Sequence, residues 1–429
     1  MSTTVRSTRS AGLSHLFAKA DWAYVLASLS LQLLLGTLFG HLYDTRIFMA
    51  TGYLVATGQD PYIPLDLTQV FHNPLFQGMT SIGYPPPWAL ILGGIYLISY
   101  NLFHSFLLYN LAIKLPIILA NLGLAYLVRN ILQAQGIGAG AARKAWVFLL
   151  FNPFVLYFTT AWGQFDSLVA LLTLASLALA GRQRLVASPI LMALAISLKP
   201  TPVPVVLALV IFLWGKPWKR LISYLAILLG GIFLFCVAPF FIFHWDASPI
   251  FQGWNAQFTV SGGMSLTTLY ELVNNTYTLS GNWWLLGIAW LPLTLAGAWL
   301  LPRRGHRLVD LVWHSLVLTL IFFLTRTWLS EQNLSLILPL VLILVMLGEL
   351  PRLALAATWI LPLFFTIFNT SPPQLLFPFW PQYMSQLLQW MDTFRSFRLV
   401  ARMLMVIPWQ MAGWWMVISG FRRKVVESL

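Results

Sequence analysis

Runs of apolar residues, separated by short loops that carry Arg and Lys, repeat along almost the whole chain. The first run, about residues 22–40, is long enough as a helix to cross the roughly 30 Å hydrocarbon core of a bilayer. Only 9% of the 429 residues are charged and 59% are hydrophobic, which leaves too little charge to cover a water-exposed surface of this size. The sequence therefore predicts an all-α polytopic membrane protein. It excludes a cytosolic globular enzyme, a disordered chain and a fibrous repeat.

The basic residues indicate how the apolar runs are threaded. Arg129, Arg143 and Lys144 flank one loop, which the positive-inside rule places in the cytoplasm. Only one crossing then fits between residues 41 and 129, so we predict an interfacial helix at 85–99 and the second span at 102–128. The other spans are predicted near residues 145–160, 167–180, 185–198, 202–214, 224–243, 283–301, 308–323, 333–347, 353–368 and 403–421. This gives twelve transmembrane helices, with both termini cytoplasmic, in a cell (inner) membrane.

The loops differ in length between the two sides, and this predicts where the chemistry takes place. We expect a single integral membrane domain over 1–429, with a cytoplasmic N-terminus at 1–21 and a cytoplasmic C-terminus at 422–429. Three long outer loops are predicted at 41–101, 244–282 and 369–402, and the first carries the interfacial helices. Because the inner loops are short and basic while most acids fall outside, the functional residues are expected at the outer membrane face.

Several classes of function find no support in the sequence. The net charge of +13 comes from small basic clusters between apolar runs, which is typical of membrane topology, and no nucleic-acid partner is predicted. A single cysteine, Cys236, allows no disulfide framework within the chain. No P-loop, zinc motif or Ser/His/Asp arrangement occurs, so ATP-driven transport is not supported.

Asp44 is the strongest candidate for a catalytic residue. It follows the first span in the stretch His-Leu-Tyr-Asp-Thr-Arg at 41–46. A carboxylate at the end of a rigid helix, near the lipid headgroups, is placed to take a proton from an acceptor hydroxyl. The structural alternative is a helix-terminal polar residue that faces water. The stretches Gly-Gln-Asp-Pro-Tyr at 58–62 and Tyr-Pro-Pro-Pro-Trp at 84–88 predict an ordered, turn-rich loop after it.

In this order, the first span, Asp44, the long outer loop and its two motifs resemble the GT-C superfamily of membrane glycosyltransferases. The pattern is most similar to the polyprenyl-phosphate-mannose-dependent mannosyltransferases of the phosphatidylinositol-mannoside and GPI types. Trp-Gly-Gln-Phe-Asp at 162–166, Ser-Leu-Lys-Pro at 197–200 and Trp-Leu-Ser-Glu-Gln-Asn at 328–333 agree with it. The resemblance covers about residues 22–340.

The resemblance implies a GT-C-like fold and an inverting transfer of a hexose, with mannose as the first candidate. The donor would be a polyprenyl-phosphate sugar and the acceptor a lipid or glycan, with Asp44 as general base. Many members of the superfamily carry two acids in the first loop, whereas Thr45 and Arg46 follow Asp44 here. This departure weighs against a divalent metal ion, and no other cofactor is predicted.

Three cations near the predicted outer face are candidates for binding the donor phosphate: Arg326, Lys199 and Arg46. Arg offers a phosphate a bidentate fork and Lys a point charge, and both stabilise a leaving group whose negative charge grows in the transition state. The alternative is that these side chains extend to the outer headgroups. Lys114 lies mid-span, and we expect it to pair with Asp166 or Glu331.

Polar residues near the ends of later spans are candidates for contacting substrate or supporting the first loop. They are Gln164, Asp166, Glu331, Gln332, Tyr84 and His72. Helix capping explains Asp166 and Glu331 equally well, and a solvated loop position explains His72. The main alternative function for the whole chain is a twelve-span secondary transporter or lipid flippase. A non-catalytic scaffold subunit is a third, in which Asp44 would be dispensable.

Overall fold

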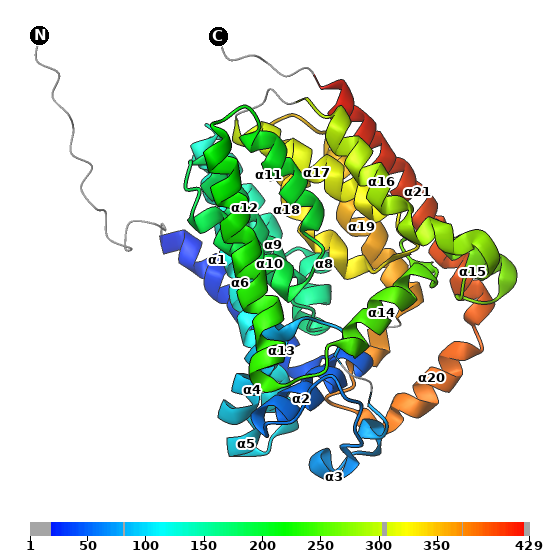
Figure 1. The fold of residues 1–429 in the computed structure, drawn as a ribbon. Coiled ribbons are helices and arrows are strands. Elements are labelled where there is room, and N and C mark those ends of the chain that lie inside the picture. Colours follow the sequence, from blue (N-terminus) through cyan, green and yellow to red (C-terminus); the bar gives the residue numbers. More distant parts are fainter. Residues whose placement is uncertain (1–18, 80–81, 303–306, 371, 424–429) are drawn as a thin grey trace, which may run out of the picture.

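The computed structural model describes residues 19–79, 82–302, 307–370 and 372–423, and this part of the chain is a bundle of helices (Figure 1). The other residues of the predicted cytoplasmic ends, 1–18 and 424–429, lie outside the described residues. Each predicted span coincides with a helix or a continuous pair of helices. These are α1 (Lys19–Leu38), α6 (Phe106–Ala134), α7 (Ala139–Leu150) with α8 (Pro153–Val155) and the π-helix η3 (Leu156–Ala161), α9 (Asp166–Gly181), α10 (Ala187–Leu198), α11 (Val203–Leu213), α12 (Trp218–Ile232) with η4 (Phe233–Val237) and α13 (Ala238–Phe243), α16 (Trp284–Leu300), α17 (Leu308–Leu324), η6 (Glu331–Leu336) with α18 (Leu338–Met346), α19 (Arg352–Asn369) and α21 (Arg395–Arg422).

Seven helices in the described part of the chain are long and apolar enough to cross a membrane. The other predicted spans fall on shorter apolar helices, such as α10 and α17. Proline explains why α10 stops early: Lys199 precedes Pro200, is therefore pushed out of the helical region, and adopts an extended backbone with φ −156° and ψ 129°. A polytopic all-α membrane protein is thus confirmed, while the count of twelve crossings stays a prediction.

The first outer loop is itself helical and forms a layer at one end of the bundle (Figure 1). It contains α2 (Leu42–Ala56), α3 (Thr68–Phe71), η2 (Pro74–Phe76), α4 (Pro86–Ile98) and α5 (Tyr100–Phe103). Helix α4 coincides with the predicted interfacial helix and packs along α2. The close approach requires glycine at Gly93, because a Cβ there would lie 2.4 Å from Cγ1 of Val55.

The two later outer loops contain shorter elements. They are α14 (Ser248–Phe258), β1 (Gly262–Gly263), α15 (Thr268–Asn274), η5 (Gly281–Trp283), η7 (Pro372–Leu375), η8 (Pro381–Tyr383) and α20 (Met384–Asp392). Strand β1 pairs in parallel with β2 (Trp328–Leu329), with Gly262 opposite Trp328. This pairing fixes the segment after α17 against the predicted outer loop at 244–282.

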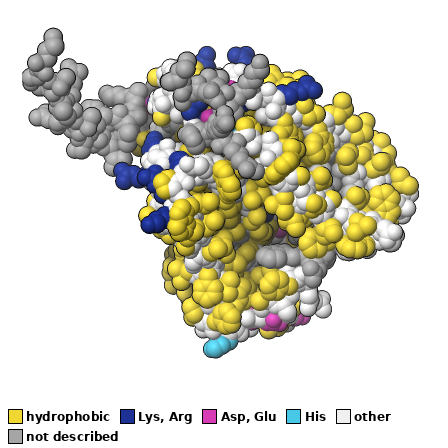
Figure 2. Space-filling model, turned by 45° about the horizontal axis from the view of Figure 1, so that its top comes forward, with side chains coloured by type: hydrophobic (Ala, Val, Ile, Leu, Met, Phe, Trp, Pro, Cys, Tyr) yellow, Lys and Arg dark blue, Asp and Glu magenta, His cyan; other side chains and the backbone are white. Residues whose placement is uncertain are grey.

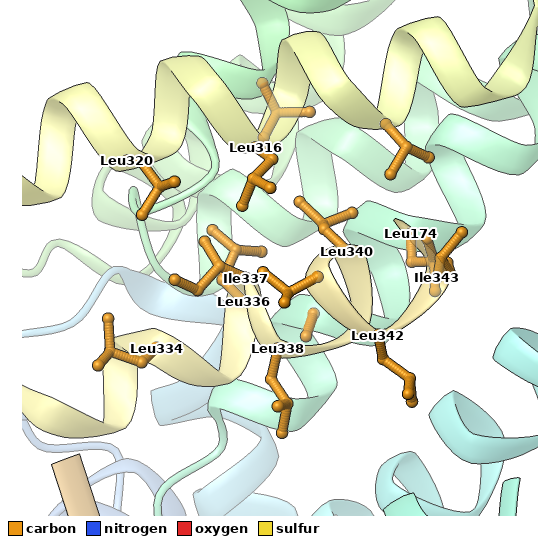
Figure 3. Close-up of a cluster of buried hydrophobic side chains, with 14 of the residues drawn as sticks. Leu174, Leu316, Leu320, Leu334, Leu336, Ile337, Leu338, Leu340, Leu342 and Ile343 are labelled. Atoms are coloured by element: carbon orange, nitrogen blue, oxygen red, sulfur yellow. The ribbon is translucent and has the colours of Figure 1, made fainter. Parts of the chain in front are cut away.

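The core lies where α9, α17 and α18 meet. Figure 3 shows Leu174 of α9, Leu316 of α17 and Leu340 of α18 among a cluster of buried aliphatic side chains. Because η6 and α18 contribute a continuous apolar run to this cluster, the start of η6 is held firmly beside the outer end of α17.

Charge is distributed unevenly over the surface. Figure 2 shows Lys and Arg gathered toward one end, a broad hydrophobic surface, and Asp, Glu and His side chains at the opposite end. The basic end is the one from which α21 leads to the C-terminus, as a comparison with Figure 1 shows. This asymmetry is the one expected from the basic loops, and the orientation in the membrane stays a prediction.

Lys114 corrects one expectation, because it pairs with neither Asp166 nor Glu331. Its Nζ donates to the carbonyl oxygens of Gly36 and Ala161, each at 3.2 Å, and to that of Phe39. Asn110 Nδ2 donates to the Gly36 carbonyl at 2.8 Å and to the Phe39 carbonyl at 2.9 Å. The last carbonyls of a helix lack partners within the helix. Lys114 and Asn110 supply those partners and so fix the end of α1.

Candidate active site

Asp44 lies in the first turn of α2, immediately beyond the fixed end of α1. His41 is the N-cap residue of α2, and its backbone N–H donates to the Trp162 carbonyl at 3.1 Å. The Asp44 backbone nitrogen lies 3.4 Å from Nδ1 of His41. These contacts join α2 to the segment that follows η3, so the position of Asp44 is set by three parts of the chain.

The Asp44 carboxylate is held by two side chains, and we call His41, Asp44 and Trp162 the Asp44 cluster. Trp162 Nε1 donates to Asp44 Oδ2 at 2.6 Å, and Nδ1 of His41 lies 2.9 Å from the same oxygen. The His41 and Trp162 rings are stacked, with centroids 4.0 Å apart and an interplanar angle of 21°. The Asp44 side chain remains 16% exposed.

The same contacts control the charge of Asp44. Burial disfavours the ionised carboxyl, but the hydrogen bond and charge of His41 and the hydrogen bond from Trp162 outweigh burial. The Gln164 amide also favours the ionised form, without closing a hydrogen bond of good geometry. The pKa of Asp44 therefore lies below its usual value, and the group is a carboxylate at neutral pH.

The segment 162–166 connects Asp44 to the rest of the site, since each of its side chains contacts a different element. Gln164 Oε1 accepts from the Tyr84 hydroxyl at 3.4 Å, and the Phe165 ring stacks on that of Trp88 in α4, with centroids 4.3 Å apart. Gly163 allows the tight path between them, because its φ is +98° and a Cβ there would lie only 3.1 Å from Cε of Lys114. The π-helix η3 directly precedes this segment.

The two motifs of the first loop meet at Tyr84. The Tyr62 hydroxyl donates to the Tyr84 carbonyl at 3.0 Å, and Asp60 Oδ1 accepts from the Tyr62 backbone N–H at 2.8 Å. Asp60 Oδ2 also accepts from the Asp246 backbone N–H at 2.6 Å, which ties the first outer loop to the second. Burial raises the pKa of Tyr84 well above its usual value, so its hydroxyl stays a hydrogen-bond donor.

A cavity of about 320 Å³ opens on the other side of Tyr84, and we call it the Arg326 cavity. It brings together four of the candidate residues, which are Tyr84, Lys199, Arg326 and Gln332. Its other polar walls include Ser330 and Asn333, and its apolar walls include Val203, Phe258, Trp290 and Phe322. A cavity lined by cations together with aromatic and aliphatic side chains suits an amphipathic ligand.

The two cations of the cavity differ in their surroundings. Lys199 Nζ lies 2.7 Å and 2.9 Å from the carboxylate oxygens of Asp166, so its charge is balanced by that residue. The Arg326 guanidinium lies over the Phe322 ring, 5.1 Å from its centroid. Burial lowers the pKa of Arg326 to about 10, which still leaves it protonated at neutral pH. Asp166 thus serves as the partner of Lys199 at the start of α9.

The other six predicted residues lie outside the cavity lining: Asp44, Gln164 and Asp166, whose contacts are given above, and Arg46, His72 and Glu331. Arg46 donates through Nε to the Leu42 carbonyl at 2.8 Å and through Nη1 to the Leu75 carbonyl, so it holds the first loop together. His72 is exposed at the end of α3. Glu331 is buried, and its Oε1 accepts from Asn369 Nδ2 at 2.8 Å.

Sequence reasoning missed three residues of the site. His41 stands next to Asp44 in the sequence, and its position three residues before Asp44 is the spacing of a helix N-cap. Trp162 belongs to one of the motifs, but no sequence signal links it to a carboxylate 118 positions away. Asn333 follows Gln332 directly and lines the same cavity.

Potential metal ligands are sparse in the part of the chain that the structure describes. No group of three or more His, Cys, Asp or Glu side chains there is arranged to hold a metal ion. The neighbours of the Asp44 carboxylate are His41 and Trp162, not a second acid. Independence from a metal ion stays a prediction.

Comparison with models of known protein families gives a match. The model of glycosyltransferase family 87 matches residues 83–327, which is more than half of the chain. The matched region includes Tyr84, Gln164, Asp166, Lys199 and Arg326, and it begins after Asp44. No curated protein matches the chain.

Proposed function

We propose that this chain, which belongs to glycosyltransferase family 87, transfers a hexose from a polyprenyl-phosphate donor to a lipid or glycan hydroxyl at the outer membrane face. Mannose is the first candidate for the sugar, on the resemblance described above. The observation that carries the proposal is that the Tyr84–Gln164 contact links an ionised carboxylate, Asp44, to a cationic cavity that Tyr84 lines.

In the proposed reaction Asp44 acts as general base. It takes the proton of the acceptor hydroxyl as that oxygen forms a bond to the anomeric carbon of the donor. The bond between the anomeric carbon and the phosphate oxygen breaks on the opposite face, and its electron pair leaves with the phosphate. The transfer therefore inverts the anomeric configuration. The Trp162 and His41 contacts keep the carboxylate ionised and oriented before the acceptor arrives.

The Arg326 cavity would receive the donor. Its cations stabilise the negative charge that grows on the departing phosphate: Arg326 offers a bidentate fork, and Lys199, which is paired with Asp166, offers a point charge. Val203, Phe258 and Trp290 provide an apolar wall for the first part of the lipid tail. A donor that brings its own activated phosphate needs no nucleotide site, in keeping with the absence of a P-loop motif from the sequence.

The family assignment favours transfer over the alternative of a secondary transporter or lipid flippase. The arrangement of the polar groups points the same way. A transporter needs its binding groups near the bilayer midplane, within reach of both sides. Here Asp44, Tyr84 and Arg326 all lie in or beside the segments predicted at the outer face.

The experiment that tests this proposal supplies the purified full chain in vesicles with a panel of labelled polyprenyl-phosphate hexoses. We expect one donor to be consumed and its sugar to appear on a lipid or glycan acceptor with inverted configuration. Retained configuration would exclude the single displacement with Asp44 as base. Failure to consume any polyprenyl-phosphate donor, with consumption of a nucleotide sugar instead, would exclude the donor class.

A further inference from the structure

Two residues that line the Arg326 cavity carry a buried amide oxygen that has no hydrogen-bond partner among the described residues. These oxygens are Oε1 of Gln332 and Oδ1 of Asn333. Both side chains are more than nine-tenths buried, at 8% and 6% exposed. A buried acceptor without a partner costs about 1–3 kcal/mol, and such groups are rare in folded proteins. Two of them side by side at one cavity indicate a ligand that donates hydrogen bonds.

These amide oxygens and the cations of the same cavity bind different chemical groups. An ionised phosphate has only acceptor oxygens, so it pairs with Arg326 and gains nothing from an amide oxygen. A sugar hydroxyl donates a hydrogen bond and therefore satisfies Gln332 or Asn333. The cavity thus has a side suited to phosphate and a side suited to hydroxyl groups, as the two parts of a sugar phosphate require.

The backbone that carries both amides is anchored by the side chain of the preceding residue, Glu331. Its Oε1 accepts from Asn369 Nδ2 at 2.8 Å, and Asn369 Oδ1 accepts from Arg402 Nη1 at 2.8 Å. Arg402 Nη2 in turn donates to Glu271 Oε1 at 3.0 Å. Helix η6 is therefore tied to α19 and α21 through its first residue, and the next two residues are left to face the cavity.

From this arrangement we infer that Gln332 and Asn333 form the subsite that binds hydroxyl groups of the transferred sugar. The subsite rests on the proposed function, because it assumes that the Arg326 cavity holds the donor. It assigns sugar selection to η6, at the end of the cavity that also contains Ser330. Glu331 is a positioning residue in this scheme and does not touch the sugar.

The test measures transfer by the full chain in vesicles from polyprenyl-phosphate-mannose and from analogues that each lack one hydroxyl group. The same donors are given to Gln332→Met and Asn333→Leu variants, which keep side-chain size and remove the acceptor oxygen. Gln410→Met is the matched control. Gln410 is also buried with an unpartnered Oε1, but it lies in α21, away from the cavity lining.

We expect Asn333→Leu and Gln332→Met each to lower transfer from the complete donor by about ten- to a hundredfold. One analogue should lose a similar factor with the unaltered chain and lose nothing further with the matching variant, since the same hydrogen bond is already absent. Gln410→Met should transfer at close to the normal rate.

Two results would overturn the subsite while leaving the proposed function standing. In the first, the unaltered chain uses every analogue as well as the complete donor. In the second, every combination of a variant with an analogue loses transfer rate by the product of the two separate losses. No hydroxyl group is then linked to either amide. A chain that transfers sugar from none of these donors would overturn the proposed function, and the subsite with it.

Discussion

The two ends of the helical bundle treat their charged residues differently. At the basic end, carboxylates are each matched by arginines: Asp21 lies 3.0 Å from Arg129 and 2.8 Å from Arg143. Asp310 lies 2.7 Å from Arg423, and the same arginine reaches Glu349 at 2.9 Å. The opposite end also contains ion pairs, Lys199 with Asp166 and Arg402 with Glu271, but there Asp44 is held by a histidine and a tryptophan, and two residues that line a cavity carry buried amide oxygens without a partner among the described residues.

This difference separates structural from functional polar groups. A buried charge that is paired with its opposite has satisfied its electrostatic requirement within the protein and is poor at binding anything else. The Asp44 carboxylate is held by His41 and Trp162 and stays partly exposed, and an unpartnered amide keeps its acceptor available. The family match alone does not make this distinction, because it covers parts of both ends.

The largest effect is expected from Asp44→Asn. The amide keeps the size of the side chain and its hydrogen bond from Trp162, but it cannot accept a proton at neutral pH. We expect the rate of sugar transfer to fall by about a hundred- to ten-thousandfold, with the thermal midpoint of the protein little changed. Asp66→Asn is the control, since Asp66 is exposed and only caps Thr68. Equal losses in the two variants would contradict the assignment of the base.

A somewhat smaller loss is expected from Arg326→Ala. Removing one donor that stabilises growing negative charge costs roughly a hundred- to a thousandfold in turnover. Arg326→Lys should recover only part of this, because a lysine keeps the charge but not the fork geometry. Steady-state kinetics with a saturating donor measure both variants. Normal turnover in the alanine variant would remove Arg326 from the mechanism and leave Lys199 as the cationic candidate.

His41→Asn should change the pH dependence of transfer more than its maximum rate. The base works only when Asp44 is ionised, so turnover falls as the pH drops through the pKa of Asp44. His41 helps to hold that pKa below its usual value, and its loss raises the pKa. The acidic limb of the pH–rate profile should therefore move to higher pH, and an unmoved limb would show that His41 only supports the fold.

Asp310→Asn tests whether the ion pairs of the basic end are structural. It breaks a buried ion pair with Arg423, which costs about 3 kcal/mol of stability when one partner is removed. We expect a lower thermal midpoint and an unchanged rate of transfer per folded molecule. A folded variant with reduced transfer would mean that the ion pairs of the basic end take part in function, and the division between the two ends would fail.

The smallest effect on activity is expected from a cysteine label that tests the orientation. Gln135 is exposed in the short loop between α6 and α7, and Gln135→Cys, made in a Cys236→Ser background, should leave transfer intact. A membrane-impermeant thiol reagent should reach it only from the cytoplasmic side of sealed vesicles. Labelling from outside would reverse the topology and place Asp44 on the wrong face.

Much of the fold could be predicted from the sequence, because the length of each apolar run and the positions of Arg and Lys are local signals. The helices α9, α16 and α19 begin and end within a few residues of the predicted spans. Helix α4 falls where charge counting required an interfacial helix. The shorter spans carry less information, since an apolar run of that length is typical of both a crossing and a buried core helix.

The site was predictable only where one short motif contained the evidence. Asp44 could be proposed from its position after a span, and Tyr84 from its proline-rich motif. Lys114 could not be assigned, because its partners are backbone carbonyls that the sequence does not distinguish from any others. The same limit applies to Asn333, whose importance depends on an unpartnered oxygen and on a cavity formed by several separate helices and loops.

The backbone hydrogen bonds of Gly40 and His41 have a consequence for biosynthesis. His41 donates to the carbonyl of Trp162, and Gly40 donates to that of Leu375 at 2.6 Å. The ribosome delivers the base among the first residues and Trp162 before the middle of the chain, but Leu375 arrives only when most of the chain has been translated and inserted. A nascent or truncated chain therefore carries Asp44 in an unfinished setting, and sugar transfer can begin only once synthesis is nearly complete.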